Sequence, residues 1–164
     1  AENGILTVMC GGDQAAFDAV HDSIGAYARI CKLLGPSGSG QLTKMVNQIC
    51  IAGVVQGLSE GINFGKAAGL DMEEVLSVIG GGAAQSWQMD NRGTTMVADK
   101  FDFGFAVDWM RKDLGICLQE ARNNNVTLPL AGLVDQFYAQ IQNLGGGRWD
   151  TSSLIRLLQI QQKS

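Results

Sequence analysis

The chain has 164 residues, 46% of them hydrophobic, which is enough to fill the core of one domain or of one domain and part of another. Its formal net charge of -4 and its lack of basic runs disfavour nucleic acid as a partner. The 4 cysteines stand far apart, and with a single histidine they form no pattern typical of a metal site, so we expect no bound metal and reduced, buried thiols.

The first 35 residues show the pattern of a strand, a helix and a second strand. An apolar run at 5–10 ends in two glycines, and Asp13 can cap a helix that follows. A second apolar run at 28–34 completes a βαβ unit. Two parallel strands do not cover themselves, so we expect further strands beside them, outside these residues. We interpret residues 1–35 as the C-terminal remnant of a larger sheet domain.

A turn-rich segment at 35–40 leads into a long helical pattern at 41–68. Glycines in such a turn let another group approach the backbone, and the first N–H groups of the helix are unpaired donors that suit an anionic ligand. Lys44 and Gln48 are four residues apart and therefore share one face of this helix. Taken alone, Lys44 is more typical of a solvated helix surface than of a catalytic site.

Glycine recurs at every fourth position from Gly53 to Gly69 in this helical pattern. Each glycine costs a helix about 1 kcal/mol relative to alanine, so the repeat predicts close packing of a second helix. Polar residues such as Gln56 and Glu60 argue against a lipid-facing helix. We therefore expect a long helix at the centre of a soluble bundle.

Further helices are predicted along the rest of the chain, at 71–79, 85–91, 107–123, 129–144 and from 150 onward. The predicted fold class is mainly α: a helical bundle built around one long central helix, preceded by a βαβ remnant of a Rossmann-like domain. No cleavable leader opens the chain, and its apolar runs are too short to span a bilayer, so we expect a cytoplasmic protein with no membrane contact.

The run from Gly35 to Gln48, G-P-S-G-S-G-Q-L-T-K-M-V-N-Q, resembles the catalytic motif of the β-hydroxyacid dehydrogenases. These are enzymes of the 3-hydroxyisobutyrate dehydrogenase and tartronate semialdehyde reductase type. Their motif usually ends in two asparagines, whereas this chain has Asn47 followed by Gln48, which is one methylene longer. Residues 1–12 resemble the end of the family's nucleotide-binding domain, and Phe105 with the triplet 112–114, K-D-L, resembles a segment that lines its cofactor cleft.

The resemblance implies a division of the chain into residues 1–35, the remnant of the dinucleotide-binding domain, and residues 36–164, an all-α substrate and dimerisation domain. It also implies NAD or NADP as cofactor, a small β-hydroxy acid or semialdehyde as substrate, and a homodimer or tetramer. No G-x-G-x-x-G fingerprint follows a first strand in these 164 residues, so we expect them to be inactive alone.

The resemblance also assigns roles to individual residues. The implied catalytic residues are Lys44, as the general acid or base at the substrate oxygen, and Gln48, as a hydrogen-bonding partner of the same oxygen or of Lys44. The implied substrate-binding residues are Gly38, Ser39, Gly40 and Asn47. The implied cofactor-binding residues are Phe105, Lys112 and Asp113, of which Asp113 would orient its neighbours rather than react.

Two alternatives remain open at this point. One is a 6-phosphogluconate dehydrogenase-like enzyme, which shares the K-M-V core but continues with histidine and asparagine where this chain has Asn47 and Gln48. The other is a noncatalytic helical oligomerisation module that keeps the fold without the activity. The presence of Lys44 favours an enzyme, because a noncatalytic relative could lose that lysine freely.

Overall fold

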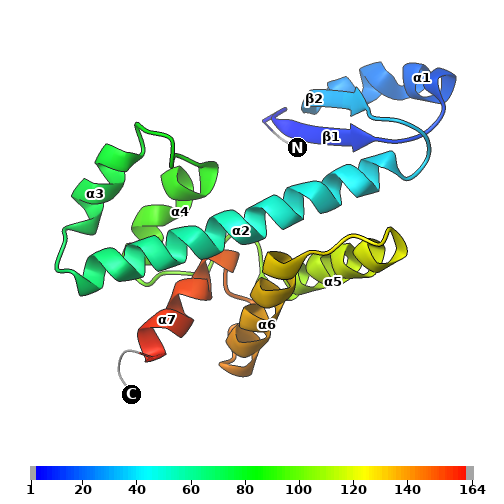
Figure 1. The fold of residues 1–164 in the computed structure, drawn as a ribbon. Coiled ribbons are helices and arrows are strands. Elements are labelled where there is room, and N and C mark those ends of the chain that lie inside the picture. The colour runs from blue at the N-terminus through cyan, green and yellow to red at the C-terminus, as the bar shows by residue number, and fades with distance from the viewer. Residues whose placement is uncertain (1–2, 162–164) are drawn as a thin grey trace. The chain divides into compact units, whose positions relative to one another are not determined.

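The computed structural model describes residues 3–161. The chain divides by compactness into two units, Ala1–Asn47 and Gln48–Ser164. Helix α2 (Ser39–Ala67) contributes its first turns to the first unit and the rest of its length to the second (Figure 1). Compactness does not test the domain boundary expected after residue 35, which stays a prediction.

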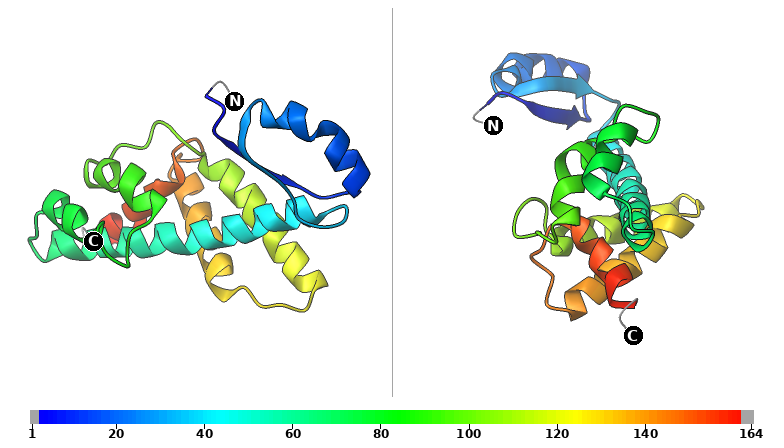
Figure 2. Two further views of the ribbon diagram at one scale, coloured as in Figure 1. Left: turned by 90° about the horizontal axis from the view of Figure 1, so that it is seen from above. Right: turned by 90° about the vertical axis from the view of Figure 1, so that its left-hand side faces the viewer.

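The first unit contains the βαβ arrangement that the sequence predicts. Strands β1 (Leu6–Cys10) and β2 (Ala28–Leu33) pair in parallel, with Val8 opposite Cys31, and helix α1 (Gln14–Gly25) connects them. The Asp13 side chain caps α1 by accepting hydrogen bonds from the backbone N–H groups of Ala15 and Ala16, at 2.9 and 3.1 Å. Both views of Figure 2 show α1 beside the two strands.

The second unit is helical. Beyond the greater part of α2 it contains α3 (Met72–Ile79), α4 (Trp87–Val97), α5 (Val107–Asn123), α6 (Pro129–Asn143), the 3-10 helix η1 (Thr151–Leu154) and α7 (Ile155–Gln161). The mainly-α fold class predicted from the sequence is confirmed, with α2 as the long helix around which the others are arranged (Figure 1).

Two apolar clusters hold the second unit together. In the first, Ala52 and Val55 of α2 pack with side chains of α5 and α6 such as Leu114 and Tyr138. In the second, Ile62 of α2 packs among residues from α3, α4 and the segment after α4, namely Met72, Leu76, Met89, Met96 and Phe101. Because the two clusters draw on successive parts of α2, this helix connects the two halves of the unit.

The glycine repeat on α2 makes close contacts only in part, so the predicted helix-packing ridge is partly wrong. A Cβ added at Gly53 would lie 3.1 Å from Leu130 of α6, and one added at Gly65 would meet the side chain of Met72. A Cβ added at Gly57 or Gly61 would meet nothing within 4 Å. These two glycines instead line an open apolar groove between α2, α3 and α4, with a volume of about 480 Å³.

The cysteines also differ from expectation. Cys117 on α5 is buried and Cys10 and Cys31 are half-buried, but Cys50 is exposed. Cys50 lies two positions before the buried Ala52, and two residues of a helix point to nearly opposite sides. The prediction of buried thiols is therefore wrong for Cys50.

Within residues 3–161, no helix combines the length and the apolar character that crossing a membrane requires. In the same range, no three His, Cys, Asp or Glu side chains gather in a way that could hold a metal ion.

Candidate functional site

The residues of the motif occupy one continuous helix. Lys44, Asn47 and Gln48 all lie in α2, and Lys44 and Gln48 are separated along its axis by about 6 Å, at about 1.5 Å per residue. Their exposure differs: Lys44 is exposed, Asn47 is half-buried, and Gln48 keeps only 2% of its surface accessible. The helix therefore offers a cation at its surface and a buried amide one turn further on.

The amide of Gln48 is bound to helix α5. Its Nε2 donates a hydrogen bond of 2.7 Å to Oδ2 of Asp113, and the same nitrogen lies 3.5 Å from Sδ of Met110. Lys112 forms an ion pair with the other carboxylate oxygen of Asp113, at 2.8 Å. The structure thus brings Gln48 together with Lys112 and Asp113, which the motif resemblance also selects and which lie 64 and 65 residues further along the chain.

The charge of Asp113 influences its surroundings on α5. The pKa of the Cys117 thiol is raised above its ordinary value, first because the thiol is buried and second because the Asp113 carboxylate disfavours a nearby thiolate. Cys117 lies one turn after Asp113 on the same helix. The ionised carboxylate therefore acts at the α2–α5 contact as a local negative charge.

Phe105 is placed by a different set of contacts. It lies in the segment just before α5, is half-buried, and its ring meets that of Trp109 edge to face at a centroid distance of 5.7 Å. Its backbone N–H donates to Oδ2 of Asp150 at 2.9 Å, and its carbonyl accepts from the N–H of Thr151. Asp150 and the start of η1 thereby hold the backbone of Phe105.

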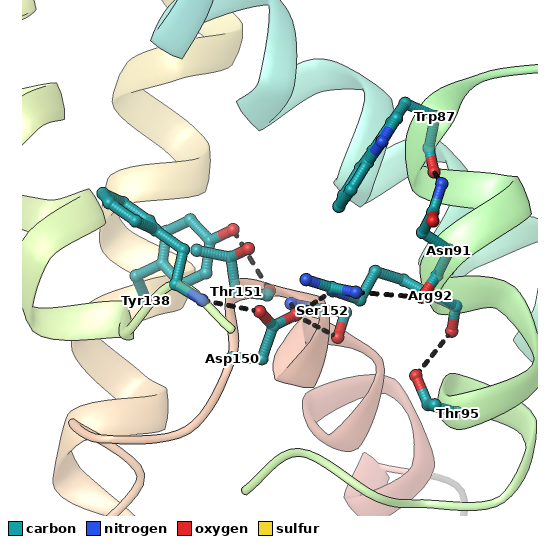
Figure 3. A network of polar contacts seen from close by, with 9 residues as sticks. Trp87, Asn91, Arg92, Thr95, Tyr138, Asp150, Thr151 and Ser152 are labelled. Atoms are coloured by element: carbon teal, nitrogen blue, oxygen red, sulfur yellow. Dashed lines mark hydrogen bonds and ion pairs between the residues drawn. The ribbon is translucent and has the colours of Figure 1, made fainter. Parts of the chain in front are cut away.

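Asp150, which begins the run D-T-S-S at the start of the last predicted helix, belongs to a network of polar contacts (Figure 3). Its carboxylate accepts from the N–H and Oγ of Ser152, at 3.1 and 2.6 Å, and forms an ion pair of 3.3 Å with Arg92 of α4. The guanidinium of Arg92 also lies over the rings of Trp87 and Phe103. The D-T-S-S pattern predicts the cap, but no sequence signal identifies the distant Arg92 as its partner.

The glycine-rich turn belongs to the first compact unit, where its backbone packs against the end of β1. Gly38 has φ +97°, a conformation that favours glycine. A Cβ added at Gly11 would lie 2.8 Å from the backbone nitrogen of Ser39, and one added at Gly40 would meet the carbonyl of Met9. Gly40 is buried, so its close backbone approach is to β1. Substrate binding by Gly38, Ser39 and Gly40 stays a prediction.

The family of the chain follows from comparison with known proteins. Residues 38–158 match the model of a protein family whose description is "NAD-binding of NADP-dependent 3-hydroxyisobutyrate dehydrogenase". The matched range includes the motif on α2, the K-D-L triplet on α5 and the Asp150 network. The chain belongs to this family of β-hydroxyacid dehydrogenases, and the resemblance seen in the motif is confirmed.

Individual relatives agree with this assignment. An uncharacterised oxidoreductase of Shewanella frigidimarina is 66% identical over 97% of this chain and 55% of its own length. The 2-hydroxy-3-oxopropionate reductase of Escherichia coli is 31% identical over 98% of this chain and 55% of its own length. The crystal structure of a 3-hydroxyisobutyrate dehydrogenase from Salmonella typhimurium, 29% identical, matches 96% of this chain and 55% of its own with a TM-score of 0.86. The chain spans about half the length of the curated relatives it matches.

Proposed function

We propose that this chain is part of an NAD(P)-dependent oxidoreductase that transfers a hydride between the nicotinamide ring and a small β-hydroxy acid or its semialdehyde. Residues 1–35 are the end of its dinucleotide-binding domain, and residues 36–164 are its all-α substrate and dimerisation domain. The observation that carries the proposal is the buried amide of Gln48, one turn from Lys44 on α2 and bonded to Asp113 of the K-D-L triplet.

The roles of the motif residues follow from their chemistry. Lys44 exchanges a proton with the substrate oxygen, and Gln48 hydrogen-bonds the same oxygen or the lysine. Asn47 and the backbone of Gly38, Ser39 and Gly40 bind the substrate, because the first N–H groups of a helix suit a carboxylate. The nicotinamide, when bound, supplies the hydride acceptor or donor.

Side chains of α5 and of Phe105, just before this helix, suit a dinucleotide. The side chain of Lys112 is 66% exposed and offers a cation to a phosphate or carboxylate oxygen, although it also pairs with Asp113. The edge-to-face pair of Phe105 and Trp109 offers an apolar wall for a planar ring. These groups would face the cofactor.

Three further parts of the proposal concern the whole protein. The apolar side chains of Ile5 and Ile30, 63% and 46% exposed, are suited to contact with further strands of a larger sheet. The strongly exposed Phe64 of α2 is suited to contact between subunits of a homo-oligomer. The four free cysteines suit the reducing cytoplasm.

The test is an activity assay on this chain extended at its N-terminus by the remainder of a dinucleotide-binding domain. We expect oxidation of NADH or NADPH with small semialdehydes, and a loss of about 10²–10⁴-fold in kcat for Lys44→Ala, the range typical of a general acid or base. Lys100→Ala, in the exposed segment after α4, is the matched control and should leave kcat unchanged. Unchanged turnover in Lys44→Ala contradicts the mechanism, and failure to bind either cofactor favours the noncatalytic module.

A further inference from the structure

The amide of Gln48 has a defined orientation. Its Nε2 donates at 2.7 Å to Asp113 and faces the sulfur of Met110 at 3.5 Å, so both of its N–H groups are directed at α5. The residue keeps 2% of its surface accessible, which leaves little room for rotation. The amide nitrogen is therefore committed to α5 and the carbonyl oxygen Oε1 is directed elsewhere.

Asp113 determines which way round the amide lies. A carboxylate only accepts hydrogen bonds, and the second oxygen of Asp113 is engaged by Lys112 at 2.8 Å. Turning the Gln48 amide over would place Oε1 against a carboxylate oxygen, two acceptors within hydrogen-bond distance at a site where the Asp113 side chain is only 13% exposed. The reversed orientation is therefore strongly disfavoured.

We infer that Asp113 is a positioning residue that fixes Gln48 as a hydrogen-bond acceptor in the reaction, an inference that rests on the proposed function. An amide carbonyl has two lone pairs and can accept from the ammonium of Lys44 or from the hydroxyl of a β-hydroxy acid. In this orientation it donates nothing to a substrate carbonyl. Gln48 therefore stabilises the protonated lysine and the hydroxyl form of the substrate.

The length of Gln48 matches the position of Asp113. An asparagine at this position would withdraw the amide by roughly the length of one C–C bond, about 1.5 Å at most. The 2.7 Å hydrogen bond would then open to about 4 Å, beyond hydrogen-bonding distance. At the spacing of α2 and α5 in this structure, Gln48 and Asp113 are thus a matched pair in length, in which the missing reach of one partner can be restored by lengthening the other.

The first experiment measures kcat and KM in the extended protein for Asp113→Asn, which can present either a donor or an acceptor to Gln48. We expect kcat to fall about 10- to 100-fold, because the charge-assisted hydrogen bond is replaced by one that no longer fixes the orientation of the amide, with KM for the cofactor changed less than about threefold. Glu120→Gln, which removes another carboxylate of α5, is the matched control and should retain full kcat. A rise in cofactor KM at unchanged kcat would overturn the inference.

The second experiment exchanges the methylene between the partners. Gln48→Asn alone should lower kcat by a similar factor, and Gln48→Asn combined with Asp113→Glu should recover kcat to within about threefold of the original protein. A purely structural role predicts losses that add in the double variant instead. If the double variant is no more active than the better single variant, the matched pair does not exist and the inference fails.

A third measurement does not depend on turnover. The side-chain amide protons of Gln48, followed by ¹⁵N–¹H NMR in the same protein, should exchange slowly with water and lose this protection in Asp113→Asn. Fast exchange in the original protein would overturn the inference. An original protein with slow exchange but no turnover would instead contradict the proposed function, so the two failures can be told apart.

Discussion

Two aspartates of the helical unit have similar partners and different surroundings. Asp150 and Asp113 each form an ion pair with a basic side chain and accept a hydrogen bond from a residue distant in sequence. Asp150 is 1% exposed, and its partners are the backbone of Phe105, the N–H and hydroxyl of Ser152, and Arg92. Asp113 is less enclosed, and it holds a side-chain amide.

The difference separates a structural carboxylate from a positioning one. The contacts of Asp150 connect α4, the segment before α5 and the start of η1, so its removal affects three parts of the fold together (Figure 3). The contacts of Asp113 orient one amide beside the motif on α2, and its cation, Lys112, is largely exposed to solvent. We therefore expect the first aspartate to govern stability and the second to govern turnover.

The largest effect is expected for Asp150→Ala. The change leaves the partly buried Arg92 without its carboxylate and the N–H of Phe105 without its acceptor, and breaking one side of a buried ion pair costs about 3–5 kcal/mol. Denaturant-induced unfolding should report a loss of that size in the free energy of unfolding. Asp102→Ala, at an exposed position of the neighbouring segment, is the control and should change it by less than about 0.5 kcal/mol.

If Asp150→Ala lowers the free energy of unfolding by less than about 1 kcal/mol, the distinction drawn between Asp150 and Asp113 is wrong. It would mean that water reaches Arg92 and Phe105 once the carboxylate is removed, and that the network in Figure 3 is only a local contact. The two aspartates would then differ in exposure but not in role.

The second prediction concerns the alkaline stability of the same network. Tyr138 of α6 is fully buried, which raises the pKa of its phenol, and the negative charge of Asp150 raises it further. The folded protein therefore keeps this proton at a pH where the unfolded chain, with a tyrosine pKa of about 10, has lost it. The contribution of Tyr138 to the free energy of unfolding is fully present below pH about 10. Above that pH the free energy of unfolding falls by up to about 1.4 kcal/mol per pH unit.

Tyr138→Phe removes the ionising group and should flatten the fall in unfolding free energy above pH 10, measured by denaturant titration at several pH values. At neutral pH it should cost only about 0.5–1.5 kcal/mol, the value of the 3.2 Å hydrogen bond from the phenol to the carbonyl of Thr151. An equal slope in both proteins would show that the phenol is hydrated in the folded state.

The contacts of Asp150 and those of Asp113 could be predicted from the sequence to different degrees. The D-T-S-S pattern predicts a cap at Asp150 because the acceptor and its donors are close in sequence. Its pairing with Arg92 depends on how α4 packs, which no local pattern encodes. Lys112 and Asp113 were selected only through the family triplet, and their contact with Gln48 required the crossing of α2 and α5.

The helices were predictable because, like the cap at Asp150, they depend on residues that are close together in sequence. Caps such as Asp71 and apolar spacing define their bounds from local sequence, and α2 agrees with the predicted 41–68 to within two residues. The glycine repeat was misleading, because its spacing shows that one stripe of α2 consists of small residues but does not show which neighbour faces that stripe. The side chain of Met72 fills the space at Gly65, whereas Gly57 borders an open groove.

The smallest change in stability is expected for Asp113→Asn. This variant tests the contrast between Asp113 and Asp150 most directly. The replacement is equal in size, an amide can still hydrogen-bond Gln48, and the lost ion pair with the exposed Lys112 is worth about 0–1 kcal/mol. The free energy of unfolding should therefore change by less than about 1 kcal/mol while kcat falls. A loss of several kcal/mol would instead show that Asp113, like Asp150, stabilises the fold. The fall in kcat would then result from a damaged contact between α2 and α5 and not from a Gln48 amide that can turn over.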